Sequence, residues 1–268
     1  METVANENEI QNLQNNKILG EPSLKNTKIN FIGYGNVLYC ENNVKITGSS
    51  INFKGNNSLI YLSNSKHNYA LNIQVIHNSL VYIGKDNNII PTVSINAQEH
   101  KNVIIGDDGS FLSNVSIRTT DAHSIYNLHT KKRVNFSNSV FIGDHVFLGH
   151  NAYLEKGVKI GSGAIVENNA HVNSNVSLSS NTLFGGNPIK ILEKDVFFIK
   201  DYPASFNAES TKDSSDYISD VYSYNNTPGE SLDLDKIDSM LSNFSVDEKI
   251  DFIQKLFVQN KRNNRFSL

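Results

Sequence analysis

The feature that most constrains the fold is a six-residue repeat that begins at Ile142. Every sixth residue from there is apolar, and the fifth position of the first seven repeats is small or β-branched. An amphipathic helix would repeat every ~3.6 residues and a half-buried strand about every second residue. A period of six, with one inward residue per repeat, instead predicts a parallel β-helix of stacked coils. The eight leading residues are Ile142, Leu148, Leu154, Ile160, Val166, Val172, Leu178 and Phe184.

The same register appears more weakly upstream of this run. Two triplets keep the spacing of six: Ile83, Ile89 and Ile95, then Ile105, Phe111 and Ile117. Two short excursions, near 96–104 and 118–141, interrupt the pattern. Residues 28–80 carry β-branched runs between Gly and Asn turns, and we interpret them as irregular coils of the same solenoid.

This pattern divides the chain into four segments. Residues 1–27 form an N-terminal extension that we expect to be helical or frayed, and residues 28–200 form the β-solenoid. Residues 201–230, rich in Ser, Asp, Asn and Tyr without a period, predict a linker. Residues 231–268 predict a short α-helical extension, because apolar residues recur at helical spacing.

The helical extension contains a start signal of its own. Ser245 and Glu248 have the spacing of a capping box, which opens the second of two expected helices. We expect the pair to cover an end of the solenoid, since terminal repeats need protection from water. A tail that binds a partner is the alternative.

Composition excludes several classes of protein. A net charge of -3 gives no general attraction to nucleic acid, and one cysteine, Cys40, rules out an intrachain disulfide. We find neither a signal peptide nor an apolar run long enough for a membrane span, so we expect a cytoplasmic protein. The 39 asparagines favour frequent turns, because Asn tolerates the left-handed backbone conformation well.

The stretch from Ile142 to Val166, with the closing turn Gly185–Lys190, resembles the left-handed β-helix acyltransferases of the hexapeptide-repeat family. That resemblance implies a left-handed parallel β-helix, usually a homotrimer, with acetyl-CoA bound between subunits and no metal. A narrower resemblance lies upstream, in Asp121-Ala-His123 and the following Arg133-Val-Asn135. These segments are similar to bacterial capsular-polysaccharide and polysialic-acid O-acetyltransferases.

In those enzymes the histidine of the D-x-H segment is the catalytic base, and this role maps onto His123. Transfer of an acetyl group to a hydroxyl requires that hydroxyl to lose a proton, and a neutral imidazole suits that step near pH 7. Asp121 could orient the imidazole or form an Asx turn. His129, on the same excursion, is the alternative base. Cys40 lies far upstream, so a covalent cysteine relay has no support.

Six further residues are candidates for binding the substrate or cofactor. His145 occupies a turn position of its repeat, and Phe147 stands where the family usually has Trp, keeping the apolar wall without an indole N–H. Arg133 ends a short basic run that could contact CoA phosphates or an acidic glycan. The six are Tyr126, Arg133, His145, Phe147, Lys159 and Lys190, of which the two lysines could also meet CoA phosphates.

Three other functions remain open at this point. The same fold acetylates amino groups of sugars in some enzymes. A zinc lyase of the γ-carbonic-anhydrase type would need three converging histidines, and only His145 and His150 have a suitable spacing. A non-catalytic scaffold would use the solenoid only to trimerise. The D-x-H segment favours an O-acetyltransferase that acts on a sugar hydroxyl.

Overall fold

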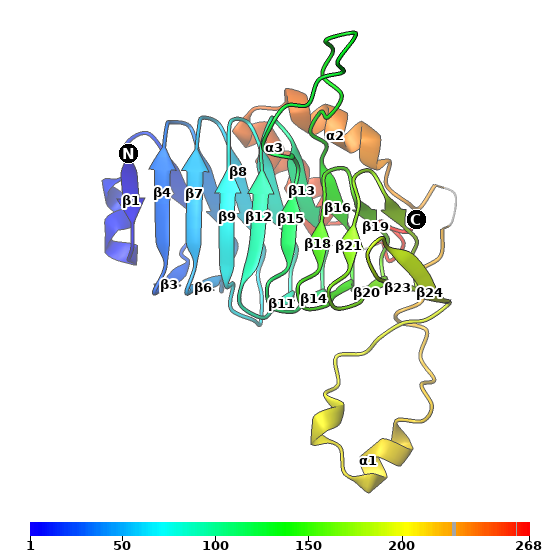
Figure 1. The fold of residues 1–268 in the computed structure, drawn as a ribbon. Coiled ribbons are helices and arrows are strands. Elements are labelled where there is room, and N and C mark those ends of the chain that lie inside the picture. The colour runs from blue at the N-terminus through cyan, green and yellow to red at the C-terminus, as the bar shows by residue number, and fades with distance from the viewer. Residues whose placement is uncertain (227–228, 261) are drawn as a thin grey trace.

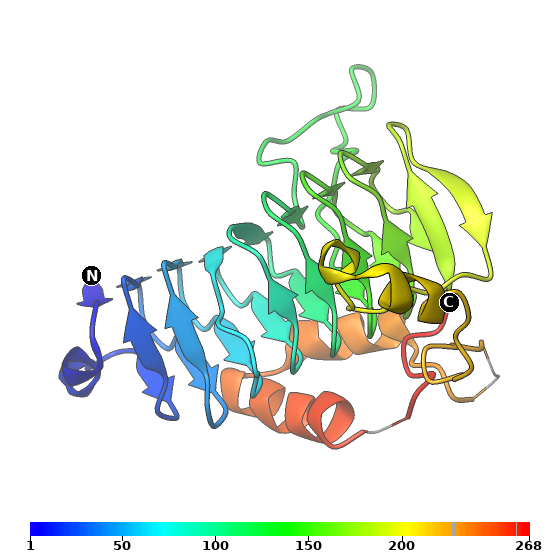
Figure 2. The ribbon, with the colours of Figure 1, turned by 90° about the horizontal axis from the view of Figure 1, so that it is seen from below.

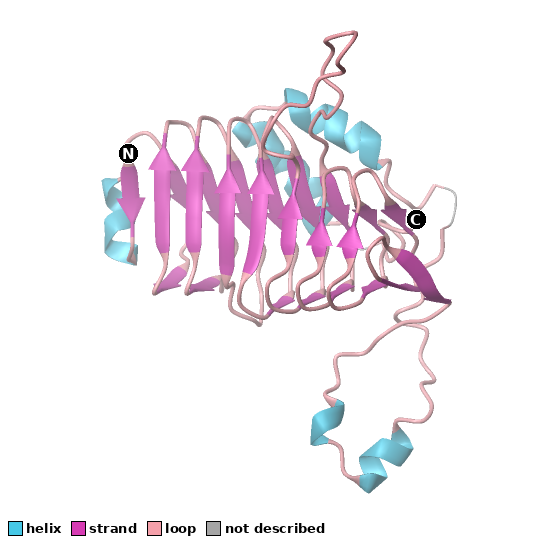
Figure 3. Ribbon diagram, in the orientation of Figure 1, coloured by secondary structure: helices cyan, strands magenta, loops and turns pink. Residues whose placement is uncertain are grey.

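Three sheets surround one axis and form a β-solenoid, whose coils stack along that axis (Figures 1 and 3). This computed structural model describes residues 1–226, 229–260 and 262–268. Two sheets have eight strands each and the third has six, and strands from successive coils pair side by side. The parallel β-helix predicted from the six-residue repeat is therefore confirmed. We call the three sheets the first, second and third face.

The strands of each face follow one another along the axis. The first face holds β1 (Glu2–Val4), β4 (Lys28–Ile32), β7 (Ser50–Lys54), β9 (Leu71–Val75), β12 (Val93–Ala97), β15 (Ser116–Arg118), β18 (Tyr153–Leu154) and β21 (His171–Val172). The second holds β2 (Lys17–Leu19), β5 (Val37–Cys40), β8 (Leu59–Leu62), β10 (Leu80–Ile83), β13 (Asn102–Ile105), β16 (Val140–Ile142), β19 (Lys159–Ile160) and β22 (Ser177–Leu178). The third holds β11 (Asn88–Ile89), β14 (Ser110–Phe111), β17 (Phe147–Leu148), β20 (Ile165–Val166), β23 (Thr182–Gly185) and β24 (Lys190–Lys194), and β3 (Ser23–Lys25) pairs with β6 (Lys45–Thr47).

The solenoid has coils of two lengths, the longer ones upstream and the shorter ones downstream, with one long insertion between them. On the first face, Ile51 pairs with Ile73 and Ile73 with Ile95, so these coils are 22 residues long. Leu154 pairs with Val172, which gives 18 residues, or three repeats of six. Residues 28–80 are therefore regular coils rather than the irregular ones expected, and their extra residues lengthen the strands. The segment 96–104 is likewise the end of one strand, a turn and the start of the next.

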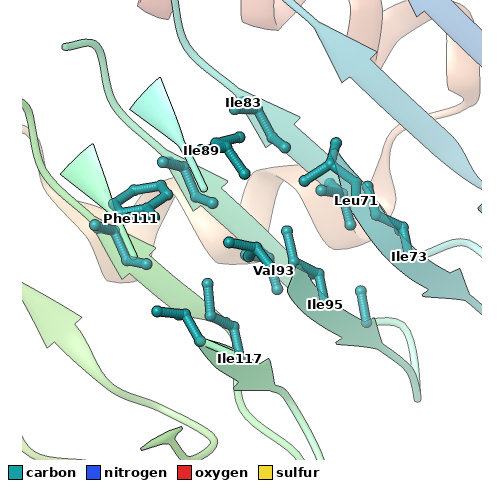
Figure 4. Packing of buried hydrophobic residues seen from close by; sticks show 14 of the residues in the cluster. Leu71, Ile73, Ile83, Ile89, Val93, Ile95, Phe111 and Ile117 are labelled. Carbon is teal, nitrogen blue, oxygen red and sulfur yellow. The ribbon is translucent and has the colours of Figure 1, made fainter. Parts of the chain in front are cut away.

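A continuous cluster of buried apolar side chains lines the interior along the axis (Figure 4). All eight leading residues of the repeat are buried, as the period of six predicts. At the corners, nine asparagines adopt positive φ, including Asn151, Asn169 and Asn175, which explains part of the unusual Asn content. Asn151 also accepts a hydrogen bond from Asn114 at 3.2 Å and donates one to Asn169 at 3.0 Å. Asparagine thus both turns the corner and joins adjacent coils.

Both ends of the solenoid are closed by antiparallel pairing. β1 runs antiparallel to β4, and a 3-10 helix (Glu7–Asn12) follows it, so the solenoid begins within the segment expected to be an extension. At the other end β24 folds back antiparallel on β23. Each closure covers backbone groups that an open sheet edge would expose.

The C-terminal helices lie against the outer side of the second face (Figure 2). They are α2 (Leu234–Asn243) and α3 (Val246–Ile253), which continues as a π-helical turn (Gln254–Val258). The capping box forms as predicted, with Ser245 and Glu248 bonded in both directions. The helices cover a side of the solenoid rather than an end. They do so because strands such as β8 and β10 carry apolar residues on both sides.

The segment between the solenoid and these helices leaves the body and returns. It contains a 3-10 turn (Pro203–Ser205) and α1 (Ala208–Asp213), and we call residues 199–221 the arm (Figure 1). No helix in the described part of the chain is long and apolar enough to cross a membrane.

A buried lysine opposes the docking of α3. Lys249 is 1% exposed and its Nζ donates to the carbonyl oxygen of Asn78. Burial lowers the pKa of Lys249 to about 8, because the charged ammonium loses its water.

Replacing Lys249 by Met should therefore stabilise the chain at pH 7 by about 1–3 kcal/mol, since burying an incompletely paired charge is unfavourable. The unfolded chain binds more protons than the folded one between the folded and ordinary pKa values. The free energy of unfolding of the wild-type chain should therefore increase as the pH rises from about 8 toward 10.5, because Lys249 loses its proton in the folded chain first. Urea unfolding across pH 7–10 measures both effects. Lys255→Met, on the exposed side of the same helical segment, is the control, and an equal response from both variants would contradict the prediction.

Candidate active site

A long insertion leaves the solenoid at the corner between the first and second faces. β15 ends at Arg118 and β16 begins at Val140, and we call residues 119–139 the excursion loop. Ile117 and Leu154 pair across it although they lie 37 residues apart. The coil therefore closes beneath the loop without losing its register, and the loop projects away from the body (Figures 1 and 2).

His123 lies on this loop with its side chain exposed. Its Nδ1 is 2.9 Å from the carbonyl oxygen of Asp121. A carbonyl oxygen can only accept, so Nδ1 carries the proton of the neutral ring. The lone pair is then on Nε2, which is the arrangement that a general base needs.

The backbone beside His123 is strained. Ala122 has φ of 64°, in the left-handed region, which costs a residue with a Cβ about 1–2 kcal/mol. Its N–H donates to Thr120 Oγ1 at 3.2 Å. Strain of this kind persists only where the surroundings fix the conformation, and it concentrates at functional sites.

Asn135 and Lys156 fix the loop through Asp121. The Asn135 amide donates to Asp121 Oδ2 and to the carbonyl of His123, both at 2.8 Å, and accepts from the N–H of Ile125 at 2.7 Å. Lys156, from the next coil, donates to the same carboxylate oxygen. Burial acts to raise the pKa of Asp121, but these hydrogen bonds and the lysine charge hold it below its ordinary value. The carboxylate therefore holds the loop, while the backbone of Asp121 orients the ring.

Arg133 makes a second attachment at the base of the loop. Its guanidinium forms two parallel hydrogen bonds with Glu99, at 2.8 and 2.9 Å. Ser137 donates to the same carboxylate, and together these bonds lower the pKa of Glu99. Arg133 is thus committed to an internal ion pair rather than to a ligand. Tyr126, which pairs with Arg133 through an isolated bridge, is 59% exposed.

His145 lies at a different corner and is fully buried. Its ring is stacked between Phe198, at a centroid distance of 4.2 Å, and Tyr222, at 3.8 Å. Nδ1 lies 2.8 Å from Asp108 and Nε2 lies 2.9 Å from the Phe198 carbonyl. Both ring nitrogens are occupied, so His145 anchors the base of the arm and offers no free atom to a ligand. Asp108 also pairs with Lys200.

The other candidates lie apart from His123. Phe147 is on the third face, where its ring packs edge-on against Phe198 at 5.5 Å. Lys159 is on the second face and pairs with Asp235 of α2 at 2.7 Å, and Lys190 is exposed on β24. One chain therefore brings only Asp121, Tyr126 and Arg133 to the loop that carries His123.

Sequence reasoning missed Lys156 and Glu99, and it gave Asn135 a place in the resemblance but no role. Lys156 is 6% exposed, which a charged residue tolerates only when it is paired, but a lysine at a turn of the repeat gives no sign of this in the sequence. Glu99 lies in a turn of the preceding coil and nothing in its local sequence indicates the contact with Arg133. Burial raises the pKa of the Cys40 thiol. A thiol that stays protonated is a poor nucleophile, so a covalent cysteine relay gains no support.

A shallow hollow of about 460 Å³ lies on the first face beyond the start of the excursion loop. Tyr153 and His171 are edge-to-face neighbours within it, at 5.0 Å, and Glu155 accepts from His171 at 2.8 Å. Arg118, the last residue before the loop, donates to the Tyr153 hydroxyl. In the described residues, no three His, Cys, Asp or Glu side chains gather as a metal site requires.

Comparison with known proteins agrees with this geometry. Residues 139–186 match the model of the bacterial transferase hexapeptide family, with six repeats. The polySia-specific acetyltransferase NeuO is 26% identical, with a TM-score of 0.66 over 75% of this chain and 93% of NeuO. The polysialic acid O-acetyltransferase OatWY is also 26% identical, with a TM-score of 0.61 over 76% and 97% of the two chains. No curated protein matches the sequence. The predicted resemblance is confirmed, and the repeats and neighbours indicate an acyltransferase.

Replacing Lys156 by Met should loosen the excursion loop, because the partly buried Asp121 loses its ionic partner. The loop contains its own reporter, since trypsin cleaves after Lys131 and Lys132, which are both exposed. We expect cleavage there to become roughly ten-fold faster, equivalent to about 1.4 kcal/mol in local opening.

Lys159→Met is the matched control, because that lysine pairs on a different face. Unchanged cleavage in Lys156→Met, or the same acceleration in both variants, would show that the Asp121 ion pair does not hold the loop.

Proposed function

We propose that this hexapeptide-repeat acyltransferase moves the acetyl group of acetyl-CoA to a hydroxyl of a sugar in a bacterial surface polysaccharide, with His123 as general base. The observation that carries the proposal is the orientation of His123, whose Nδ1 donates to the Asp121 carbonyl and leaves Nε2 as the acceptor. The similarity to two polysialic acid acetyltransferases supports the choice of a hydroxyl acceptor and a capsular glycan.

The reaction needs no acyl-enzyme. His123 Nε2 takes the proton of the acceptor hydroxyl as its oxygen attacks the thioester carbonyl carbon. The C–O bond forms, and the carbonyl oxygen gains the negative charge of a tetrahedral intermediate. Collapse of the intermediate breaks the C–S bond and releases the CoA thiolate, which the imidazolium at His123 can protonate. The products are the sugar acetate and free CoA.

The negative charge on the intermediate requires a hydrogen-bond donor. Phe147 has none to offer, although the family usually has an indole N–H in that position. We therefore assign the donor to a backbone N–H of a neighbouring coil. Phe147 contributes an apolar wall instead.

The acceptor site that fits best is the first-face hollow next to the excursion loop. Tyr153 offers a ring for a sugar to lie against, and Arg118 beside it offers positive charge to an acidic sugar. Its guanidinium carbon lies 5.7 Å from the Tyr153 ring centroid. These contacts support an acidic glycan over a neutral one.

The donor site requires more than one chain. His123 lies on one corner while Phe147 and Lys190 lie on the third face, so a homotrimer with acetyl-CoA between subunits joins groups that a single chain keeps apart. The second face is covered by α2 and α3, which leaves the first and third faces for such contacts. Acetyl-CoA is a cytoplasmic metabolite, and we place the reaction in the cytoplasm.

Replacing His123 by Ala should lower acceptor-dependent release of free CoA thiol by about 10²–10⁴-fold, the usual contribution of a general base. The assay uses acetyl-CoA with a panel of acidic and neutral bacterial polysaccharides, and an amino sugar as a separate acceptor. His129→Ala is the control, since that exposed histidine is on the same loop, and it should retain wild-type activity.

Activity that survives in His123→Ala but is lost in His129→Ala would move the base to His129. Release that depends only on the amino sugar would identify an N-acetyltransferase. A wild-type protein that releases no thiol with any acceptor would contradict the proposed function.

A further inference from the structure

Two segments project from the solenoid, and neither is packed against the rest of the chain along its length (Figures 1 and 2). The excursion loop, residues 119–139, leaves one corner of the solenoid. The arm, residues 199–221, leaves the corner beside His145 and extends in a different direction. Both views show that the two overlap in their position along the solenoid axis.

The arm combines exposed apolar side chains with negative charge. Ile218 is 101% exposed, Tyr202 is 73% exposed and Val221 is 55% exposed. Five acidic residues, against Lys200 and Lys212, lie between 200 and 221. Lys200 is already paired with Asp108 at 2.8 Å. The projecting part therefore presents apolar contacts within an acidic surface.

The excursion loop has the complementary character. Leu128 is 74% exposed and Phe136 is 63% exposed, so this loop also presents large apolar side chains to water. Its remaining charges are positive, because Arg133 is paired with Glu99 and Asp121 with Lys156. Lys131 and Lys132 are exposed and form no ion pair with any described residue.

The base of the arm is fixed at the corner beside His145. Phe198 and Tyr222, which flank the arm, hold the ring of His145 between them, and Lys200 forms an ion pair with Asp108. Asn181 also donates to the Tyr222 carbonyl at 2.8 Å and accepts from the N–H of Tyr224 at 2.7 Å. A flexible tail would have no such anchors. Both ends of the projecting segment are therefore attached to the same corner of the solenoid.

We propose that the acidic arm of one copy of this chain binds the basic excursion loop of a second copy. Apolar side chains at the centre with opposite charges around them are the usual composition of a specific interface. The two surfaces differ, so the contact is head-to-tail, and repetition of such a contact closes into a ring when the rotation permits. The partner is a second copy of this chain, because the surface that complements the arm is on the chain itself.

One consequence rests on the proposed function. If His123 is the base, the arm of the neighbouring copy borders the acceptor site, and the assembly is needed for full activity. The association can be tested without acetyl-CoA or any acceptor. A failure of the proposed chemistry and a failure of the proposed contact are therefore distinguishable.

Charge reversal on exposed residues provides the test. Lys131→Glu with Lys132→Glu reverses the loop, and Asp213→Lys with Asp216→Lys reverses the arm. In sedimentation velocity at low salt, each pair alone should raise the dissociation constant for self-association by about ten-fold or more. The combination of all four should return it to within about three-fold of wild type, because opposite charges again face each other.

Two controls separate the contact from general effects of charge and hydrophobicity. Lys236→Glu with Lys255→Glu makes the same change of net charge as the loop reversal, on exposed residues of the helices that cover the second face, and should leave association unchanged. Ile218→Ser should weaken association, since that fully exposed side chain contributes nothing to the fold, whereas Met240→Ser, at an exposed position of α2, should not.

Three results would overturn the proposal. A wild-type chain that sediments as a monomer throughout the micromolar range excludes the contact. Reversal of either charge cluster without effect on association excludes the electrostatic pairing. If the variant with all four substitutions self-associates as weakly as either pair alone, the loop and the arm do not face each other.

Discussion

The pairing of each coil with the next is the constraint on which the rest of this structure depends. The inward residues of every coil must stay in register, since a shift would bring their polar neighbours into the buried apolar interior. Additional residues can therefore enter only where they keep this register, either by lengthening the strands of a coil or at a corner. The 22-residue coils accept four more residues than the 18-residue coils, and one corner accepts the whole excursion loop. The loop can thus carry a strained backbone at Ala122 while the coil beneath it remains regular.

The eight histidines illustrate how position on this framework decides chemistry. His123 and His145 are identical in intrinsic basicity, and only their surroundings separate them. His123 is exposed with one nitrogen fixed by a backbone carbonyl, whereas His145 is buried between two aromatic rings with both nitrogens bonded. The first arrangement leaves a lone pair available for a proton. In the second, the imidazole joins the solenoid to the base of the arm.

That extension changes what the solenoid can do with its surface. The helices cover the second face, and Arg265 reinforces the attachment by pairing with Asp144 at 2.7 Å and Asp107 at 2.9 Å. A buried arginine between two carboxylates is stable only when all three are bonded, so this contact ties the C-terminus to the turn that carries His145. The arm is consequently held between two fixed points, while α2 and α3 keep the second face covered.

The sequence by itself determined the solenoid, because an inward residue at every sixth position is a local pattern that no helix or isolated strand satisfies. It also determined the capping box at Ser245 and identified the D-x-H segment. The exact coil length upstream, the covering of a side by α2 and α3, and the burial of His145 depended on contacts between residues far apart in the chain. Glu99 with Arg133 and Asp121 with Lys156 are such contacts, joined only when one coil stacks on another. Periodicity specifies which side chains point inward, but which outward side chains meet is decided by the stacking itself.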